Sequence, residues 1–447
     1  MSTTVLDQDA RPEDRFISAF KVNEGKALNG TNAPVSSQRQ DAIERFAQLG
    51  IPTNNLEAWK YTNISKEIDR PYALPLALEQ PSVDHDDIAP FLLDDLDAHL
   101  LVLINGRPSE SLSALGDLPE GVVVSGLDAA GQSHPELIEA HYGEYADYDD
   151  EALKALNTAF VQDGTFLYVP SGTVVEKPIF VLELTASNED VFVQPRHLFV
   201  VEDGGVARLI QAQHRLTSSQ TFTNAVTEVY VGSKGNFEQY LLQNEGATGS
   251  RVENVAAYHE DDSTHTTSTI TLSGNVVRNN ITITADGAHC ESNLYGLFLG
   301  RGGMHVDNHT LVEHVHPDCV SNELYKGVLN ETSTGIFNGK VFVDRGAQRI
   351  NAYQSNKSIV LTNEAQMFSK PELEIYADDV ECSHGATTGE IDEEALFYLR
   401  SRGLPEDRAR VLMLQAFVQD VIDEISIDPL REHVEGLVRE RFSSEFV

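Results

Sequence analysis

The stretch TSTITLSGNVVRNNITIT, residues 267–284, decides the fold class of this chain. It contains two short runs of Thr, Ile and Val separated by Ser, Gly and Asn, which is typical of β-strands joined by tight turns. Runs of the same kind occur at residues 166–169, 178–184 and 226–231. No segment between residues 164 and 380 carries a helical stripe, so a parallel sheet with crossover helices is disfavoured. A sandwich, a large barrel and a β-helix remain open, because no fixed-length repeat separates them.

The strand pattern divides the chain into three parts. We expect a strand core over residues 161–384, preceded by an N-terminal helical or mixed region over residues 1–160. A C-terminal helical domain is expected over residues 385–447. Two acidic segments, residues 84–97 and 144–151, are interpreted as solvated loops or faces.

Helix signals lie on both sides of the strand core. Ser37 to Gln40 fits a capping box, which predicts a helix over residues 37–49 that ends at Gly50. In the tail, Asp392 is predicted to cap one helix.

Two further helices are predicted beyond Gly403. Pro405 begins the first of them, with Leu412 among the apolar residues assigned to its buried side. The last helix is predicted from about Pro429, with Leu430 among its apolar residues. A small helical domain of this kind is suited to binding a partner protein.

The composition excludes several classes of partner. The 447 residues include 70 Asp and Glu against 32 Lys and Arg, a net charge of −38. Binding to nucleic acid or to an anionic membrane needs clustered basic residues, so both are disfavoured. Only 11 of the basic residues are Lys. This composition favours a halophilic host, and an ordinary acidic cytosolic protein is the alternative.

The localisation expected from the sequence is cytoplasmic. The first residues lack the basic and apolar regions of a secretory signal, and no apolar run approaches the ~18 residues of a membrane span. Three cysteines, Cys290, Cys319 and Cys382, are too few for a disulfide framework or a four-cysteine zinc site.

The strongest local candidate for chemistry is the pair Cys382 and His384. In an extended segment, residues two apart face the same side, so the thiol and the imidazole could bind one soft metal. A buried cysteine near a hydrogen-bonded histidine is the more usual situation, and the spacing alone favours that interpretation.

A second cluster comprises His305, Asp307 and His309, followed by His314 and His316. The first three alternate along a strand-like stretch, which is compatible with a metal site or with a polar outer surface. We favour the outer surface.

Neither the remaining cysteines nor any known enzyme motif points to a catalytic or metal site. Cys290 and Cys319 have no His or acid in ligand register and are interpreted as small buried apolar residues. The sequence contains no P-loop, zinc-protease, nucleophile-elbow or dinucleotide-binding motif. Any nucleotide hydrolysis is therefore expected in another chain.

Four segments resemble a known family. They are DRGAQRINAYQ at residues 344–354, PELEIYADDVECSHGAT at 371–387, LFYLRSRG at 396–403 and WKYT at 59–62. Together they resemble the SufB/SufD family, the scaffold subunits of the SUF system for iron-sulfur cluster assembly. The resemblance implies a right-handed parallel β-helix flanked by an N-terminal α/β region and a small C-terminal helical domain. This favours the β-helix over the sandwich.

The resemblance is closer to the SufD branch of the family. SufB carries a Gln-Cys-Asp element whose cysteine holds the nascent cluster, and this chain has Gln354, Ser355 and Asn356 there. A serine hydroxyl is a poor substitute for a thiolate on iron. A SufB-like role is the alternative interpretation.

The resemblance also implies site residues. His384 and Cys382 match SufD positions implicated in cluster formation, so they are the expected metal and cluster ligands, in a site shared with SufB. Contact with the ABC-type ATPase SufC is expected at residues of the following helix, namely Phe397, Tyr398, Leu399, Arg402 and Gly403.

The partners and cofactors implied by the resemblance are those of a non-enzymatic scaffold. They are SufB, SufC and a sulfur donor of the cysteine desulfurase type, with a transient iron-sulfur cluster or iron at the SufB interface and ATP only through SufC. A homodimer in isolation is also expected. We further expect the excess acid to be thinner around Cys382, His384 and the helical tail than elsewhere.

Two other functional classes stay open. One is a polysaccharide-degrading β-helix enzyme that uses paired carboxylates on adjacent coils. The other is a metal-holding protein centred on His305, Asp307 and His309.

Overall fold

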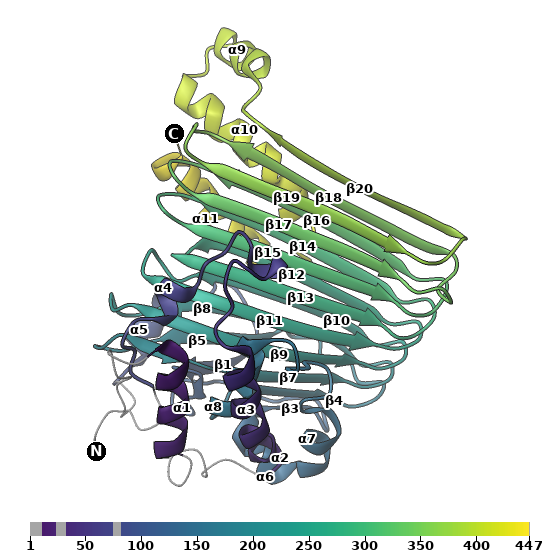
Figure 1. The fold of residues 1–447 in the computed structure, drawn as a ribbon. Helices are drawn as coiled ribbons and strands as arrows, with labels where there is room; N and C mark the ends of the chain where they lie inside the picture. The colour runs from purple at the N-terminus through teal and green to yellow at the C-terminus, as the bar shows by residue number, and fades with distance from the viewer. Residues whose placement is uncertain (1–10, 24–32, 75–81, 447) are drawn as a thin grey trace.

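The computed structural model describes residues 11–23, 33–74 and 82–446, and its centre is a parallel β-helix (Figure 1). Two ten-stranded sheets face each other, and from β7 onward successive strands alternate between them. Neighbouring core strands within each sheet pair in parallel, as β10 does with β12 and β11 with β13. Each coil of chain therefore contributes one strand to each sheet, which confirms the β-helix and excludes the sandwich and the barrel.

The first sheet contains, in spatial order, β2 (Arg107–Pro108), β1 (His99–Ile104), β5 (Ile179–Thr185), β8 (Val206–Arg215), β10 (Asn236–Asn244), β12 (Thr264–Ser273), β14 (Glu291–Gly300), β16 (Val320–Leu329), β18 (Ile350–Val360) and β20 (Val380–Gly389). The second sheet contains β19 (Gln366–Ile375), β17 (Thr334–Val343), β15 (His305–His314), β13 (Val276–Ala285), β11 (Gly249–His259), β9 (Thr221–Val231), β7 (Arg196–Val201), β4 (Thr165–Val169) and β3 (Val123–Gly126), with β6 (Val191–Val193) paired to β9. The predicted runs lie in or overlap β4, β5, β9, β12 and β13. The expected division between residues 384 and 385 falls inside β20, so the β-helix continues to Gly389.

Alternation along each strand fills the space between the sheets. Phe237 and Leu241 of β10 point inward and meet Val255 and Ile281 of the opposite sheet in one buried cluster. Residues paired on neighbouring strands share a face, so the same position of each coil lines the interior. Inward-facing side chains at the same position of successive coils therefore stack on one another. We call each such stack an interior column; the columns run along the axis of the β-helix.

The N-terminal region wraps the outer face of the second sheet and the first coils. Its helices are α1 (Pro12–Asn23), α2 (Ala33–Ser37), α3 (Arg39–Leu49), the 3-10 helix η1 (Glu57–Trp59), α4 (Ser65–Ile68), α5 (His85–Ile88), the 3-10 helix η2 (Ala89–Phe91), α6 (Leu127–Ser133), α7 (Pro135–His141) and α8 (Ala152–Phe160). Phe16 of α1 lies 5.2 Å, between ring centroids, from Phe192 of β6, which stacks on Phe222 of β9 at 4.9 Å. Aromatic burial of this kind anchors the helices to the sheet.

Two predictions for this region need correction. Ser37 is the last residue of α2, and α3 begins after Gln38, which makes no side-chain cap, so the predicted capping box is wrong. The end of α3 at Gly50 is confirmed by a φ of 69° and a hydrogen bond from its N–H to Phe46 O. The acidic segment 84–97 is not only loop, because Asp84 caps α5.

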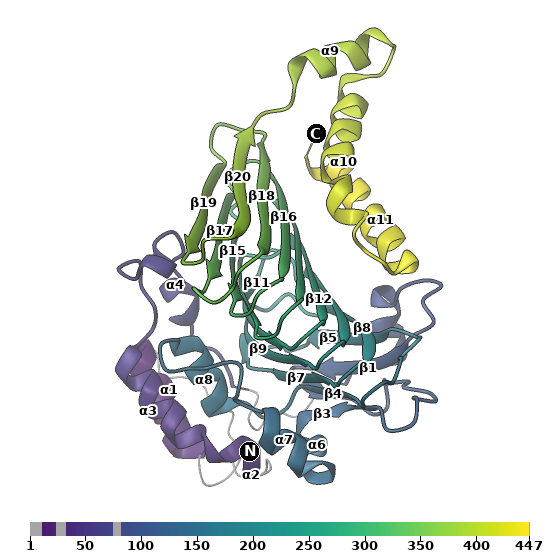
Figure 2. The same cartoon turned by 90° about the vertical axis from the view of Figure 1, so that its right-hand side faces the viewer.

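Three C-terminal helices follow β20: α9 (Glu393–Ser401), α10 (Glu406–Ile422) and α11 (Asp428–Glu445). Asp392 caps α9 by accepting hydrogen bonds from the N–H groups of Glu394 and Ala395, as predicted. The helices α10 and α11 cover the outer face of the first sheet, whereas α9 stands away from it (Figure 2). No helix in the described ranges is both long and apolar enough to cross a membrane.

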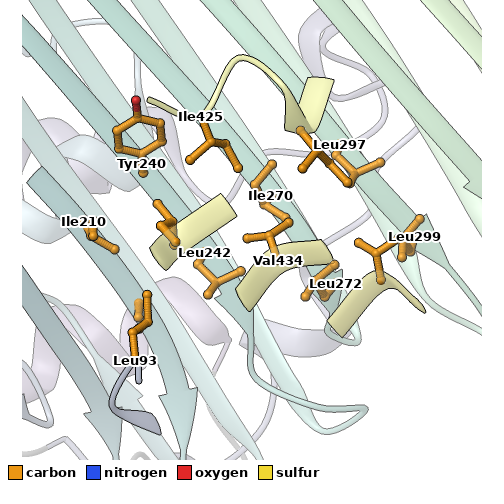
Figure 3. Packing of buried hydrophobic residues seen from close by; sticks show 14 of the residues in the cluster. Leu93, Ile210, Tyr240, Leu242, Ile270, Leu272, Leu297, Leu299, Ile425 and Val434 are labelled. Atoms are coloured by element: carbon orange, nitrogen blue, oxygen red, sulfur yellow. The ribbon is translucent and has the colours of Figure 1, made fainter. Parts of the chain in front are cut away.

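The contact between these helices and the first sheet is apolar. Ile425 and Val434 pack among Leu242, Ile270 and Leu297 of three neighbouring strands (Figure 3). The assignment of Leu412 to the buried side is wrong, because its side chain is 47% exposed. The face of α10 that meets the core is formed by Leu414, Val418 and Val421.

Candidate functional site

The last coil of the β-helix ends in open strands. Among the described strands, β20 pairs only with β18, and β19 pairs within its sheet only with β17 (Figure 2). Residues 383–389 of β20 are all exposed. A strand with one free edge presents unpaired backbone N–H and C=O groups to any chain that can add a strand.

Cys382 and His384 lie on β20 and face the same side, as their spacing predicts. Cys382 pairs with Ala352 and His384 with Gln354 on β18, and both partners are buried side chains of the interior. The two candidate ligands therefore stack on interior residues of the preceding coil, at the ends of two interior columns. They are accessible because no further coil covers them.

The surroundings of the two side chains differ. Cys382 is half-buried against an apolar cluster that includes Ile350 and Ala352, and this burial raises the pKa of its thiol. The sulfur is therefore protonated at neutral pH until a metal or a neighbouring charge displaces the proton. The imidazole of His384 is exposed and free to turn toward a ligand.

A buried polar column lies beneath His384. Glu323, Gln354 and His384 occupy paired positions on β16, β18 and β20. Gln354 Nε2 donates a hydrogen bond to Glu323 Oε2 at 2.6 Å, and the hydroxyl of Thr310 donates to the same carboxylate. Burial raises the pKa of Glu323 to about 7.

This arrangement fixes the direction of the Gln354 amide. Because Nε2 is held by the carboxylate, Oε1 is the free end, and it is buried with no hydrogen-bond partner in the described part of the chain. The amide lies against Gly339, where an added Cβ would come within 2.4 Å of Nε2. Sequence reasoning missed Glu323 because only the strand register brings it into this column.

The cluster around His305, Asp307 and His309 is a structural contact. The three side chains share the outer face of the second sheet, as predicted, but this part of the face is covered and Asp307 is 1% exposed, so the prediction of an open surface is wrong. Its carboxylate accepts hydrogen bonds from Arg278, at 2.7 Å, and from Thr62, and it lies 3.0 Å from His309 Nε2. These partners hold the pKa of Asp307 well below its usual range, against the effect of burial.

The same cluster clamps the N-terminal WKYT segment onto the β-helix. The guanidinium of Arg278 lies 3.9 Å from the ring centroid of Trp59, and Thr62 Oγ1 lies 2.8 Å from His305 Nε2. Within residues 11–23, 33–74 and 82–446, no group of three or more His, Cys, Asp or Glu side chains is arranged to hold a metal ion. The geometry therefore gives no support to the metal-holding hypothesis.

The remaining histidines and cysteines of the prediction are dispersed. His314 is buried in the interior, where its Nε2 lies 2.9 Å from Ser321 Oγ, whereas His316 is exposed beside Asp286. Cys290 and Cys319 are buried as predicted. The prediction that they lack a histidine neighbour is wrong for Cys319, because Cys290 and His314 both lie near enough to lower the pKa of its thiol.

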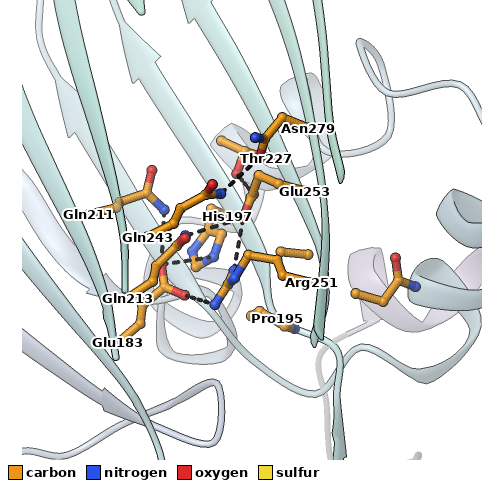
Figure 4. Close-up of polar contacts among 12 residues, drawn as sticks. Glu183, Pro195, His197, Gln211, Gln213, Thr227, Gln243, Arg251, Glu253 and Asn279 are labelled. Carbon is orange, nitrogen blue, oxygen red and sulfur yellow. Dashed lines mark hydrogen bonds and ion pairs between the residues drawn. The ribbon is translucent and has the colours of Figure 1, made fainter. Parts of the chain in front are cut away.

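Paired carboxylates do occur inside the early coils, but they are closed to solvent. Arg251 makes an ion pair with Glu253, at 2.9 Å, and lies 3.7 Å from Glu183 (Figure 4). It makes a further ion pair with Glu245, at 3.0 Å. Burial raises the pKa of Glu253 to about 7. His197 lies 3.6 Å from Glu183 in the same network. These carboxylates are buried and paired within the interior, so they face no surface on which a glycan could bind.

The helix α9 presents an exposed aromatic pair. Phe397 is 71% and Tyr398 56% exposed, and the Arg402 guanidinium lies 5.2 Å from the Tyr398 ring centroid. Leu399 turns the other way and packs against the core, and Gly403 leaves the helix with a φ of 94°. Exposed aromatic and arginine side chains of this kind are typical of protein contact sites.

The expected thinning of acid near the site is wrong. Asp378, Asp379 and Glu381 are exposed next to Cys382, and α9 begins with the exposed acidic residues Glu393 and Glu394. The open end of the β-helix is thus an acidic surface.

Comparisons with known proteins agree over most of the chain. Residues 184–417 match the family model described as "SUF system FeS cluster assembly, SufBD core domain", and residues 10–181 match "SufBD protein N-terminal region". The chain is 29% identical to an iron-sulfur cluster assembly SufBD family protein of Synechocystis, over 94% of this chain and 93% of that one. It is 27% identical to the iron-sulfur cluster assembly protein SufD of Escherichia coli, over 91% and 93%, and 25% identical to SufD of Bacillus subtilis, over 90% and 93%.

Proposed function

The chain belongs to the SufBD family of the SUF system for iron-sulfur cluster assembly, and on this premise we propose that it is a non-catalytic scaffold subunit that pairs with SufB. The observation that carries the proposal is the open last coil, where Cys382 and His384 extend interior columns into solvent. An open parallel edge is suited to a partner that also ends in a parallel β-helix, because strand addition satisfies both edges.

The site proposed at this edge is shared between two chains. Ser355 stands where a cluster-holding thiolate is expected in SufB, so that thiolate comes from the partner. On this side we assign the imidazole of His384 as the main ligand and the thiol of Cys382 as an auxiliary ligand or sulfur acceptor. A cluster that must leave is better held by few, mixed ligands than by four thiolates of one chain.

We assign contact with the ATPase SufC to the C-terminal helical domain. Phe397, Tyr398 and Arg402 supply the exposed aromatic and cationic surface, while Leu399 and Gly403 fix the orientation and the end of α9. SufC then hydrolyses the ATP, and a cysteine desulfurase system supplies the sulfur. The complex works in the cytoplasm, and the isolated chain forms a homodimer through the edge that SufB otherwise covers.

Co-purification tests this assignment. The affinity-tagged chain, expressed together with SufB and SufC of the same organism, should bring down both proteins in a complex that survives gel filtration. Recovery of neither partner under conditions in which the tagged chain is folded and abundant would overturn the proposal.

A further inference from the structure

Cys290 and Cys319 lie side by side on neighbouring coils. They immediately precede β14 and β16, which pair in register from Glu291 with Val320, and Val320 N–H donates to Cys290 O at 2.8 Å. Residues aligned on adjacent parallel strands have Cα atoms roughly 5 Å apart, within the range of about 4.4–6.8 Å that a disulfide spans.

The two sulfur atoms share one small pocket of the interior. Each Sγ lies 3.1 Å from the carbonyl oxygen of Gly287, so the two thiols share one hydrogen-bond acceptor. Position 287 is restricted to glycine, because a Cβ there would lie 2.1 Å from the backbone N of Asp261. Because both sulfur atoms contact the same oxygen, rotation of the two side chains is sufficient to bring the sulfur atoms together.

The environment makes the two thiols unequal. The neighbouring Cys290 and the buried His314 lower the pKa of the Cys319 thiol. The neighbouring Cys319 and burial raise the pKa of the Cys290 thiol. A thiol whose pKa is lowered, next to a thiol whose pKa is raised, is the arrangement of an attacking and a resolving cysteine.

Access to the pair is limited to small molecules. Both cysteines are buried, but they lie directly under the turn of residues 286–289, whose His289 is exposed. Because both cysteines are buried, a hydroperoxide reaches them through a smaller opening of the turn than a protein thiol would need.

We propose that Cys290 and Cys319 are a redox-active dithiol that a hydroperoxide closes to an intrachain disulfide. The Cys319 thiolate attacks one peroxide oxygen, the O–O bond breaks, and hydroxide leaves as the sulfur becomes a sulfenic acid. The Cys290 sulfur then attacks the Cys319 sulfur, and the sulfenic oxygen departs as water with the Cys290 proton. Two electrons pass from the sulfurs to the peroxide, and a dithiol reductant restores both thiols. This chemistry is separate from the cluster site and does not depend on the proposed function.

The test uses the purified full chain, reduced and then treated with hydrogen peroxide. After unfolding and alkylation, the treated protein should retain one alkylatable thiol, that of Cys382, instead of three. Trypsin should release peptides 279–301 and 302–326 joined by a disulfide that a dithiol reductant separates. Cys382→Ser is the matched control and should form the same linked peptides at the same rate.

Two single variants separate the roles of the sulfurs. Cys319→Ala should leave Cys290 unoxidised, whereas Cys290→Ala should stop at a sulfenic acid on Cys319 that dimedone traps. If either variant does not fold, the wild-type peptide map decides the question. Full alkylation of Cys290 and Cys319 after peroxide treatment, or a disulfide that includes Cys382, would overturn the proposal.

Discussion

The side chain of Gln354 lies one coil below that of His384, in the same interior column, and its amide oxygen is buried without a partner in the described part of the chain. An unsatisfied buried carbonyl costs free energy unless a donor reaches it. The ring N–H of His384 is the donor in register, so Gln354 is suited to fix which imidazole nitrogen stays free for a metal.

We predict that Glu323→Gln reverses this orientation. The new amide can donate to Gln354 Oε1, which turns Gln354 Nε2 toward His384 and favours the opposite tautomer of the ring. Nitrogen-15 chemical shifts of the His384 ring in the isolated chain measure the change. Gln243→Leu is the control, because Gln243 bonds to Asn279 in distant coils and should leave these shifts unaltered. Identical His384 shifts in Glu323→Gln and wild type would remove Gln354 from the site.

His384→Ala should leave a SufB–SufC complex assembled but lower its iron and labile sulfide several-fold. The imidazole contributes a ligand and little packing, because the side chain is exposed. Metal and sulfide assays on complexes purified after expression measure the effect. Ser383→Ala, one residue away on the opposite face of β20, should retain wild-type cluster content. Equal content in the two variants would contradict the assignment of His384.

Replacing both Phe397 and Tyr398 by Ala should weaken SufC binding while SufB binding persists. Exposed aromatic anchors at interfaces contribute about 2 kcal/mol each, so the loss of one to two full anchors should raise the dissociation constant by about 30-fold to 1,000-fold. Titration calorimetry with purified SufC measures this change. Val174→Ala removes another exposed apolar side chain, on a turn of the β-helix, and should leave the affinity unchanged. Wild-type affinity in the double variant would remove α9 from the contact.

Thr62→Val should destabilise the folded chain by about 1–3 kcal/mol. The substitution keeps the volume but removes the hydroxyl that donates to the buried Asp307 carboxylate. Chemical denaturation measures the loss of unfolding free energy. Thr53→Val, which makes the same substitution at an exposed position, is the control. Equal unfolding free energies in both variants would mean that the WKYT segment is not clamped through this hydrogen bond.

The chain should lose stability as pH falls from about 6.5 to about 4, in part because of His265. Burial lowers the pKa of this imidazole to about 4, so over that interval the unfolded chain binds a proton that the folded chain refuses. The loss from this residue amounts to about 3 kcal/mol at the lower pH. His265→Asn should reduce the acid-dependent loss by that amount in denaturant titrations at several pH values. If His265→Asn and wild type lose the same unfolding free energy as the pH falls, His265 does not titrate as its burial requires.

The sequence was sufficient for the strand core but not for the contacts between coils. Alternation within residues 267–284 identifies two strands because the interior of each coil needs one apolar face. The Glu323–Gln354–His384 column is invisible to such reasoning, since the residues are about thirty apart in sequence and meet only through strand register.

The errors have similar physical causes. The interpretation of Asp307 failed because the segment that buries it, with Trp59 and Thr62, lies far away in the sequence. The capping box predicted at Ser37 is wrong because Ser37 is the last residue of the short preceding helix α2. The pairing of Cys290 with Cys319 required the register of β14 with β16.

The one-sided pairing of β20 also has a thermodynamic consequence. In a stack of coils each coil is stabilised by its nearest neighbours, so a terminal coil has half the support of an internal one and frays first. Whatever docks on β20 acts as a terminal cap, and part of its binding free energy is spent on ordering that strand. Amide hydrogen exchange at residues 380–389 should therefore slow when SufB binds, and the geometry of Cys382 and His384 becomes fixed only in the capped stack.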